Sequence, residues 1–200
     1  MWTLWLPLSD WLFETKSKYP WQDEVATLKV VVDSDWAGCL ETRRSTSGGL
    51  VMLGRHPLRT WSATQSVVAL SSAEAELYSM TEGASRGLAI QSMLREMCVS
   101  VHLVVATDSS AAKAFAATRG LGRMRHLEVK DLWLQELVKS GRLSLEKILG
   151  CLNPADAMTK YLDRASLQKQ LALGGITVVV AGSCGTLRRN GERRAADPES

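Results

Sequence analysis

The sequence predicts an α/β fold: a mixed five-stranded sheet, with three antiparallel meander strands plus two parallel strands, and helices on both faces. Three observations lead to this prediction. Short β-branched runs separated by turn residues come first, as in an antiparallel meander. Strand-like and helix-like segments then alternate, as in sheets covered by helices. Two of the apolar runs end in an aspartate, Asp33 and Asp108.

The meander is expected between residues 28 and 63. The first strand is predicted over Leu28–Asp35, where three consecutive valines suit a strand buried on both faces. Residues 43–48 form a polar turn, and strands are expected over Gly49–Leu53 and Leu58–Ala63. The short connections between these strands favour antiparallel pairing.

A long helix is predicted to begin at Ser71 and Ser72, because serine side chains cap the first amides of helices. Apolar residues then recur at helical spacing as far as Cys98. Gly83 and Gly87 weaken this helix or let another element approach it closely.

The second half of the domain alternates between strands and helices. Strands are expected over Val101–Thr107 and Leu143–Leu149. Helices are expected from Ser109 to about Thr118, over Leu127–Ser140, from Asn153 with Pro154 in the first turn, and over Arg164–Leu173.

The length of 200 residues allows one domain with extensions. We expect a Trp-rich extension over 1–24, interpreted as the remnant of an upstream region, the domain over 25–173, and a disordered Gly/Arg-rich tail over 174–200. The hydrophobic fraction of 46% and the net charge of +3 are ordinary for a globular protein and permit an anionic partner.

The four cysteines are widely separated and form no Cys-x-x-Cys pair, which argues against a zinc site or a disulfide framework. The apolar start of the chain lacks the basic lead of a signal peptide and is too short to span a bilayer. We therefore expect an intracellular protein, cytoplasmic or nuclear, with no membrane partner.

Four acidic residues are candidates for one site. If the strands that end in Asp33 and Asp108 are parallel neighbours, the two side chains lie side by side at one sheet edge. Glu76 and Asp156, each about one turn into a helix, can complete the group. Converging carboxylates imply divalent cations, which in pairs hydrolyse phosphodiesters. The alternative explanations are that Asp33 simply belongs to a turn at the end of its strand, and that Glu76 lies on the solvated face of its helix.

Several motifs then match a known family in its own order. They are Asp33–Gly38, Arg43–Gly48, Val68–Tyr78, Thr107–Ala111, Arg125–Leu127 and Asn153–Lys160. Together they span roughly residues 25 to 170. The chain resembles the type I ribonuclease H domain of copia-type retrotransposon Pol polyproteins, which follows the reverse transcriptase in those proteins.

The resemblance implies a ribonuclease H-like fold and an endonuclease that hydrolyses the RNA strand of RNA–DNA hybrids. It implies two Mg²⁺ ions, with Mn²⁺ as a substitute, and a reverse transcriptase domain as a partner within the parent polyprotein. Its catalytic and metal-binding quartet corresponds here to Asp33, Glu76, Asp108 and Asp156. Asp35 and Glu74 lie close by in sequence but match the pattern less well.

Basic and hydroxyl side chains are candidates for binding the hybrid, because phosphate contacts give sequence-independent affinity. The candidates are Arg43, Arg44, Ser45, Lys113, Arg123, Arg125 and His126. Solvated helix ends and turn propensity are the alternative explanations for them.

Besides a non-enzymatic interaction module that uses the tryptophan-rich start, two other functions stay open on the sequence alone. One is a catalytically inert retroelement fragment that folds and binds nucleic acid only. The other is a nuclease or transposase of the same superfold with a different substrate, since a fold does not determine a substrate.

Overall fold

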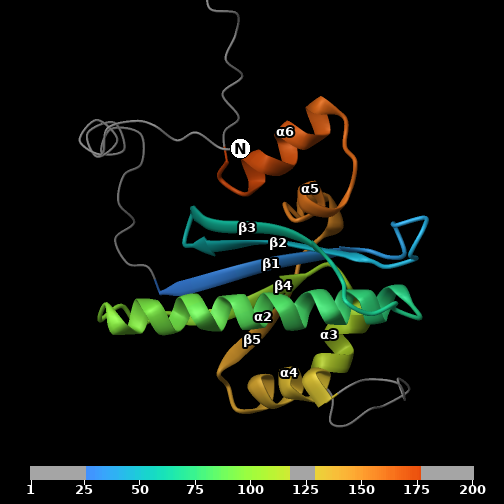
Figure 1. Cartoon of the computed structure of the whole chain (residues 1–200). Coiled ribbons are helices and arrows are strands. Elements are labelled where there is room, and N and C mark those ends of the chain that lie inside the picture. The colour runs from blue at the N-terminus through green and yellow to red at the C-terminus, as the bar shows by residue number, and fades with distance from the viewer. Residues whose placement is uncertain (1–25, 118–128, 177–200) are drawn as a thin grey trace, which may run out of the picture.

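The structure, a computed structural model, describes residues 26–117 and 129–176, apart from the side chains of 115 and 129–131 (Figure 1). The strands are β1 (Thr27–Asp35), β2 (Thr46–Leu53), β3 (His56–Thr64), β4 (His102–Thr107) and β5 (Leu143–Lys147). The helices are α2 (Ser72–Glu96), α3 (Ser110–Ala117), α4 (Val129–Lys139), α5 (Asp156–Thr159) and α6 (Arg164–Leu173), with a 3₁₀ turn, η1 (Gly150–Leu152).

The strands form one mixed sheet in the order β3-β2-β1-β4-β5. The β1–β2 and β2–β3 pairs are antiparallel, and the β1–β4 and β4–β5 pairs are parallel. The predicted fold class is therefore confirmed. The parallel register sets Val31 opposite Ala106, so β1 and β4 end at the same edge of the sheet.

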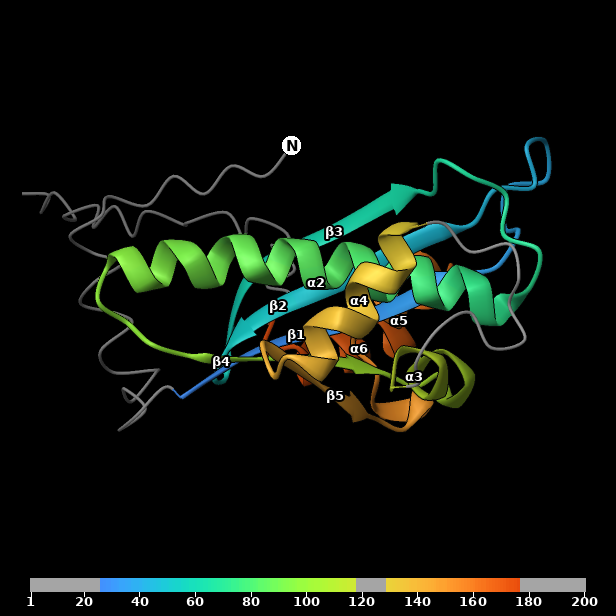
Figure 2. The ribbon, with the colours of Figure 1, turned by 90° about the horizontal axis from the view of Figure 1, so that it is seen from below.

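Helices cover both faces of this sheet. Figures 1 and 2 show α2, α3 and α4 on one face and α5 and α6 on the other. Because side chains alternate along a strand, Val30 and Val32 join the large core beneath α2, whereas Val31 packs with Ala106 and Ala155 on the α5 face. Asp33 follows Val31 by two residues and lies on the α5 face as well.

Helix α2 lies close to β1 and β4 because it presents glycines to these two strands. A Cβ atom on Gly83 would lie 2.5 Å from Val32 Cγ1, and one on Gly87 would lie 2.7 Å from Leu103 Cδ1. Any larger residue would push the helix away from the sheet. The close approach that the sequence suggested for these two glycines is confirmed.

Two elements begin three residues away from their predicted starts, whereas the other boundaries differ by two residues at most. Strand β2 begins at Thr46, not Gly49, because Asp35 pairs with Thr46 and the ladder continues to the end of β1. The helix expected from Asn153 is wrong in extent, because α5 is a single turn that begins at Asp156. Pro154 therefore precedes the helix, and Asp156 is its first residue and not one turn inside it.

Within the described residues, no helix is both long and apolar enough to cross a membrane. Cys39, Cys98 and Cys151 are free thiols. The extension predicted over 1–24 lies outside the described residues, as does the tail beyond residue 176, so the predicted domain boundaries stay a prediction.

Candidate functional site

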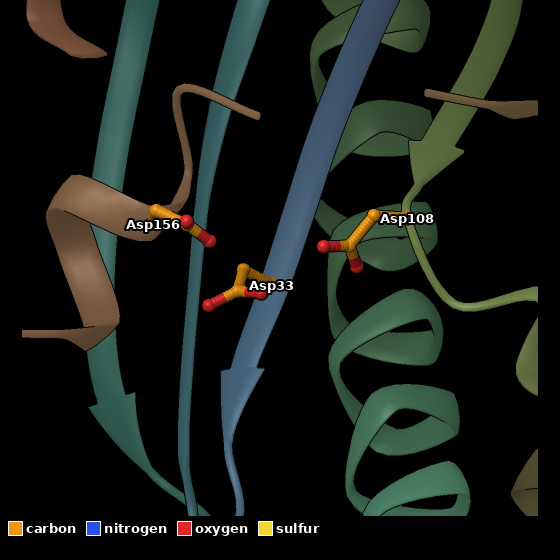
Figure 3. Close-up of side chains that lie close together, drawn as sticks. All are labelled: Asp33, Asp108 and Asp156. Atoms are coloured by element: carbon orange, nitrogen blue, oxygen red, sulfur yellow. The ribbon is translucent and has the colours of Figure 1, made fainter. Parts of the chain in front are cut away.

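Three aspartates from distant parts of the chain converge at one edge of the sheet. Asp33 lies near the end of β1, Asp108 follows β4, and Asp156 begins α5. One carboxylate oxygen from each lies within 4.8 Å of the other two. Figure 3 shows Asp33 between the other two side chains. The convergence predicted for these three residues is thus present in the structure.

Strand β2 leaves room for α5 to approach Asp33. Gly48 is the register partner of Asp33, and a Cβ atom there would lie 2.6 Å from Thr159 Cγ2 and 2.8 Å from Met158 Cβ. With any other residue in that position, α5 would sit higher above the strand. The Ser79 hydroxyl donates a hydrogen bond of 2.7 Å to the Asp33 carbonyl oxygen from the opposite face, which ties α2 to the same point of the strand.

A buried amide side chain connects α5 to β1. Asn153 is fully buried, and its Nδ2 donates to the Val32 carbonyl oxygen at 3.2 Å. Its Oδ1 accepts from the Ala155 amide at 3.0 Å. Both ends of the side chain are therefore bonded, and the backbone just before Asp156 is held against the strand residue just before Asp33.

Glu76 reaches the site from α2, one turn after the helix begins. Its Oε1 accepts a hydrogen bond of 3.2 Å from the Ser34 amide, next to Asp33. Its Oε2 is buried with no hydrogen-bond partner among the described residues. Glu76 is not one of the three residues whose oxygens lie within 4.8 Å of one another. It thus borders the aspartate cluster and leaves one acceptor oxygen unused.

Burial dominates the electrostatics of the two innermost carboxyls. Burial, with the charge of Asp33 added, raises the pKa of Glu76 from 4.5 to about 8, although the Ser34 hydrogen bond opposes the shift. Burial also raises the pKa of Asp33 from 3.8 to about 6. The charges of Asp156 and Asp108 add to that shift, so both groups resist ionisation while no cation neutralises them.

Two side chains at the end of α5 partly compensate Asp33. The Thr159 hydroxyl donates a hydrogen bond to Asp33 Oδ2. The Lys160 Nζ lies 3.4 Å from the same oxygen and 2.8 Å from Asp156 Oδ1. Burial works against the Lys160 charge, but its hydrogen bond and ion pairs with the two aspartates raise its pKa. The site therefore already holds one positive charge in the described structure.

These observations fit divalent cations. Carboxylate oxygens are the ligands that Mg²⁺ prefers, and the three aspartates present one each within a small volume. The unpartnered Glu76 Oε2 is a further ligand atom at the border of the cluster. Two carboxyls with raised pKa values are expected where a bound cation is needed to favour the ionised forms.

The two neighbouring acids have structural surroundings. Glu74 accepts hydrogen bonds from the Leu70 amide at 2.8 Å and the Tyr78 hydroxyl at 2.7 Å, while its own amide donates to the Ser71 side chain. This pattern is close to a capping box at the start of α2. Asp35 belongs to the last pair of the β1–β2 ladder and is outside the aspartate cluster.

The candidates for nucleic-acid binding divide into three groups. Arg43 and Arg44 are exposed in the loop after β1, and Lys113 is half-buried on α3. Ser45 is fully buried, and its hydroxyl accepts a hydrogen bond of 3.0 Å from the Ala37 amide, so it organises this loop and is not free to touch a phosphate. The sequence interpretation of Ser45 is therefore corrected. Arg123, Arg125 and His126 lie outside the described residues.

Sequence reasoning missed the residues that position the acids. Asn153, Thr159 and Lys160 occur in the motif that carries Asp156, but no role followed from their residue types. The spacing of four residues between Asp156 and Lys160 was the one available signal, because residues four apart are neighbours on a helix.

Comparison with known proteins finds relatives among transposon polyproteins. The chain is 30% identical over 139 residues to the retrovirus-related Pol polyprotein from transposon TNT 1-94 of Nicotiana tabacum, covering 68% of this chain and 10% of the relative. It is 31% identical over 166 residues to that from transposon RE2 of Arabidopsis thaliana, covering 82% of this chain and 11% of the relative. The chain thus spans about a tenth of the length of the curated relatives that it matches.

Among solved structures, a ribonuclease H1 isolated from compost by a metagenomic approach superposes with a TM-score of 0.51 at 17% identity, covering 66% of this chain and 92% of the other. At this identity the likeness concerns the fold. No protein-family model matches the chain.

Proposed function

We propose that this chain, a ribonuclease H-like domain homologous to a segment of plant-transposon Pol polyproteins, is a metal-dependent endonuclease that hydrolyses the RNA strand of RNA–DNA hybrids. The observation that carries the proposal is the convergence of Asp33, Asp108 and Asp156, with Glu76 at their border. These residues come from four separate elements, and their mutual repulsion would disfavour the arrangement unless cations were held there.

In this proposal the four acids hold two divalent ions, Mg²⁺ or Mn²⁺. Such ions supply the activation of a water molecule and the stabilisation of the leaving oxygen in phosphodiester hydrolysis. Asp33 lies between the other two aspartates and would help to hold both ions. Asp108 and Asp156 would each supply a carboxylate oxygen as well, and Glu76 would contribute its unpartnered Oε2.

The substrate would be held by its phosphates. Arg43 and Arg44 are exposed in the loop that follows β1, beside the edge where Asp33 lies, and Lys113 is on the helix that follows Asp108. Cationic side chains around the acids would offset the repulsion between the site and a polyanion. Discrimination between RNA and DNA would rest on the 2′-hydroxyl of the cleaved strand. Contacts from Arg123, Arg125 and His126, and a tethered reverse transcriptase domain as partner, are part of the proposal.

The test is cleavage of a labelled RNA–DNA hybrid in the presence of Mg²⁺. Asp33→Asn keeps the size of the side chain but removes its charge, so the rate should fall at least about a hundredfold, more than the loss of residues that only support metal ligands. Asp35→Asn is the matched control, because it makes the same change two residues along the chain and outside the cluster. It should cleave nearly as fast as the wild type.

Undiminished cleavage by Asp33→Asn would reject the assignment of the site. Duplex RNA and duplex DNA, assayed beside the hybrid, decide the substrate class, since a transposase-like enzyme would prefer duplex DNA. A wild-type chain that binds the hybrid but cleaves none of the three substrates would favour the inert fragment.

A further inference from the structure

Lys160 occupies a position that a divalent ion would also need. It directly follows α5, and its Nζ lies 2.8 Å from Asp156 Oδ1 and 3.4 Å from Asp33 Oδ2. Among the ion pairs of the described residues, those of Lys160 are the ones that involve the aspartate cluster. One ammonium group thus bridges two of the three carboxylates.

The bridge partly neutralises the side of the site between Asp33 and Asp156. Asp33 Oδ2 accepts a hydrogen bond from the Thr159 hydroxyl and also forms an ion pair with the Lys160 ammonium, so this oxygen already has two partners. The contact between the ammonium and Asp156 Oδ1 is a hydrogen-bonded ion pair. A divalent ion that used these same oxygens would compete with the ammonium, because the two cations would repel each other strongly at contact distance.

The side chain of Lys160 is able to move away from the two carboxylates. It is 43% exposed, whereas the side chain of Asp33 is 2% exposed. A lysine is a point charge on a flexible four-carbon stem, so its head can move into solvent without moving the backbone. The carboxylates, by contrast, belong to a strand and to a helix start that Asn153 holds in place.

We propose that Lys160 is a resident cation that bridges Asp33 and Asp156 in the metal-free protein and competes with the divalent ion for that side of the site. The inference rests on the proposed function, since it assigns a regulator to the same metal site. Its consequence is that the ion between Asp33 and Asp156 binds more weakly than the carboxylates alone would allow. That side of the site should then fill last.

The experiment measures Mn²⁺ binding by isothermal titration calorimetry and thermal unfolding in EDTA. Lys160→Met removes the charge and keeps the stem, and Lys160→Arg keeps a cation. Lys139→Met is the matched control, because it removes the same charge away from the aspartates. Lys139 ends α4, four residues before Leu143, and Leu143 pairs with the start of β4, whereas Asp108 follows the end of β4.

The two measurements should change in opposite directions. If the ammonium occupies the bridge about nine-tenths of the time, Lys160→Met should bind Mn²⁺ about tenfold more tightly than the wild type. The same variant should unfold at a lower temperature in EDTA, because Asp33 and Asp156 lose their counter-ion. Lys160→Arg should stay close to the wild type in both measurements, and so should Lys139→Met.

Unchanged or weaker Mn²⁺ binding by Lys160→Met would overturn the inference, because a purely structural lysine would lower stability without raising ion affinity. That outcome leaves the nuclease proposal intact if the wild type still cleaves the hybrid. Conversely, tighter binding by Lys160→Met in a protein that cleaves no hybrid would support the role of Lys160 and reject the nuclease.

Discussion

At the scale of single residues, the site keeps carboxyl groups where ionisation is unfavourable. Burial raises the pKa of Glu76 to about 8 and that of Asp33 to about 6. In the unfolded chain both groups ionise near their ordinary values of 4.5 and 3.8. A raised pKa in the folded state means that the folded protein holds its proton more tightly, so its stability falls as the pH rises through this interval.

In the metal-free protein, the raised pKa of Glu76 should make stability depend on pH. Below pH 4.5 the Glu76 carboxyl is protonated in both states and has little effect on stability; between pH 4.5 and about 8 only the folded state keeps the proton. Relative to Glu76→Gln, the wild type should therefore lose stability with rising pH, by about 2–5 kcal/mol by the upper end of this interval. Urea unfolding in EDTA across this pH range measures the difference.

The variant is a matched comparison because glutamine can still accept the Ser34 hydrogen bond through its side-chain oxygen. A stability difference that stays constant with pH would contradict the assignment of a raised pKa to Glu76. In saturating Mg²⁺ the stability of the wild type relative to Glu76→Gln should instead rise with pH, since a bound cation favours the ionised carboxylate.

At the scale of elements, α5 shows how a very short helix can carry a functional residue. It is one turn long, from Asp156 to Thr159, and a helix of this length has little stability of its own. Its position comes from contacts outside it: Gly48 beneath it and Asn153 before it. The placement of Asp156 should therefore be sensitive to a residue that is not itself acidic.

Asn153→Ala tests this dependence. The substitution leaves the buried Ala155 amide and the Val32 carbonyl without their side-chain partner, which should destabilise the fold by about 1–3 kcal/mol. Hybrid cleavage should also fall under conditions where the variant is folded, because α5 is no longer held against β1. Denaturant unfolding and the cleavage assay provide the two readouts.

Leu152→Ala is the control for this prediction, since Leu152 precedes Asn153 in the chain but is 49% exposed. It should change stability only slightly. If Asn153→Ala unfolded at the same denaturant concentration as Leu152→Ala, the buried amide would not have the anchoring role described here.

At the scale of the whole molecule, the site depends on the topology. Asp33 and Asp108 meet because β1 and β4 are parallel neighbours, while Glu76 and Asp156 come from helices on opposite faces of the sheet. The unfolded chain has no such cluster, because these residues are far apart in sequence. A divalent ion should therefore bind the folded state and stabilise it through linkage.

Thermal unfolding with and without Mg²⁺ tests this expectation. An ion concentration about a hundred times the dissociation constant should raise the melting temperature by about 5–10 °C. The increase should disappear in Asp33→Asn, which removes the central carboxylate, and persist in Asp35→Asn. An equal increase in all three proteins would indicate a general salt effect and would contradict a specific site.

Much of the fold could be predicted from the sequence because its signals are local. The three valines of β1, the serine cap of α2 and the two glycines of α2 can each be recognised within a short stretch of sequence, and each prediction is confirmed. The extent of α5 was wrong for the opposite reason. Asn153 bonds to the Ala155 amide and to the carbonyl oxygen of Val32, which is distant in sequence, so a contact with β1 sets the backbone before Asp156.

Residue type, periodicity and motif order are all written along the chain, and they were enough to predict the fold class, the order of the elements, the resemblance to Pol polyproteins and the identity of the three aspartates. The folded structure was needed to show that Asp33 lies between Asp108 and Asp156, that Ser45 is buried, and that Lys160 bridges two of the acids. The physical reason is that burial and charge pairing depend on which segments pack together in space.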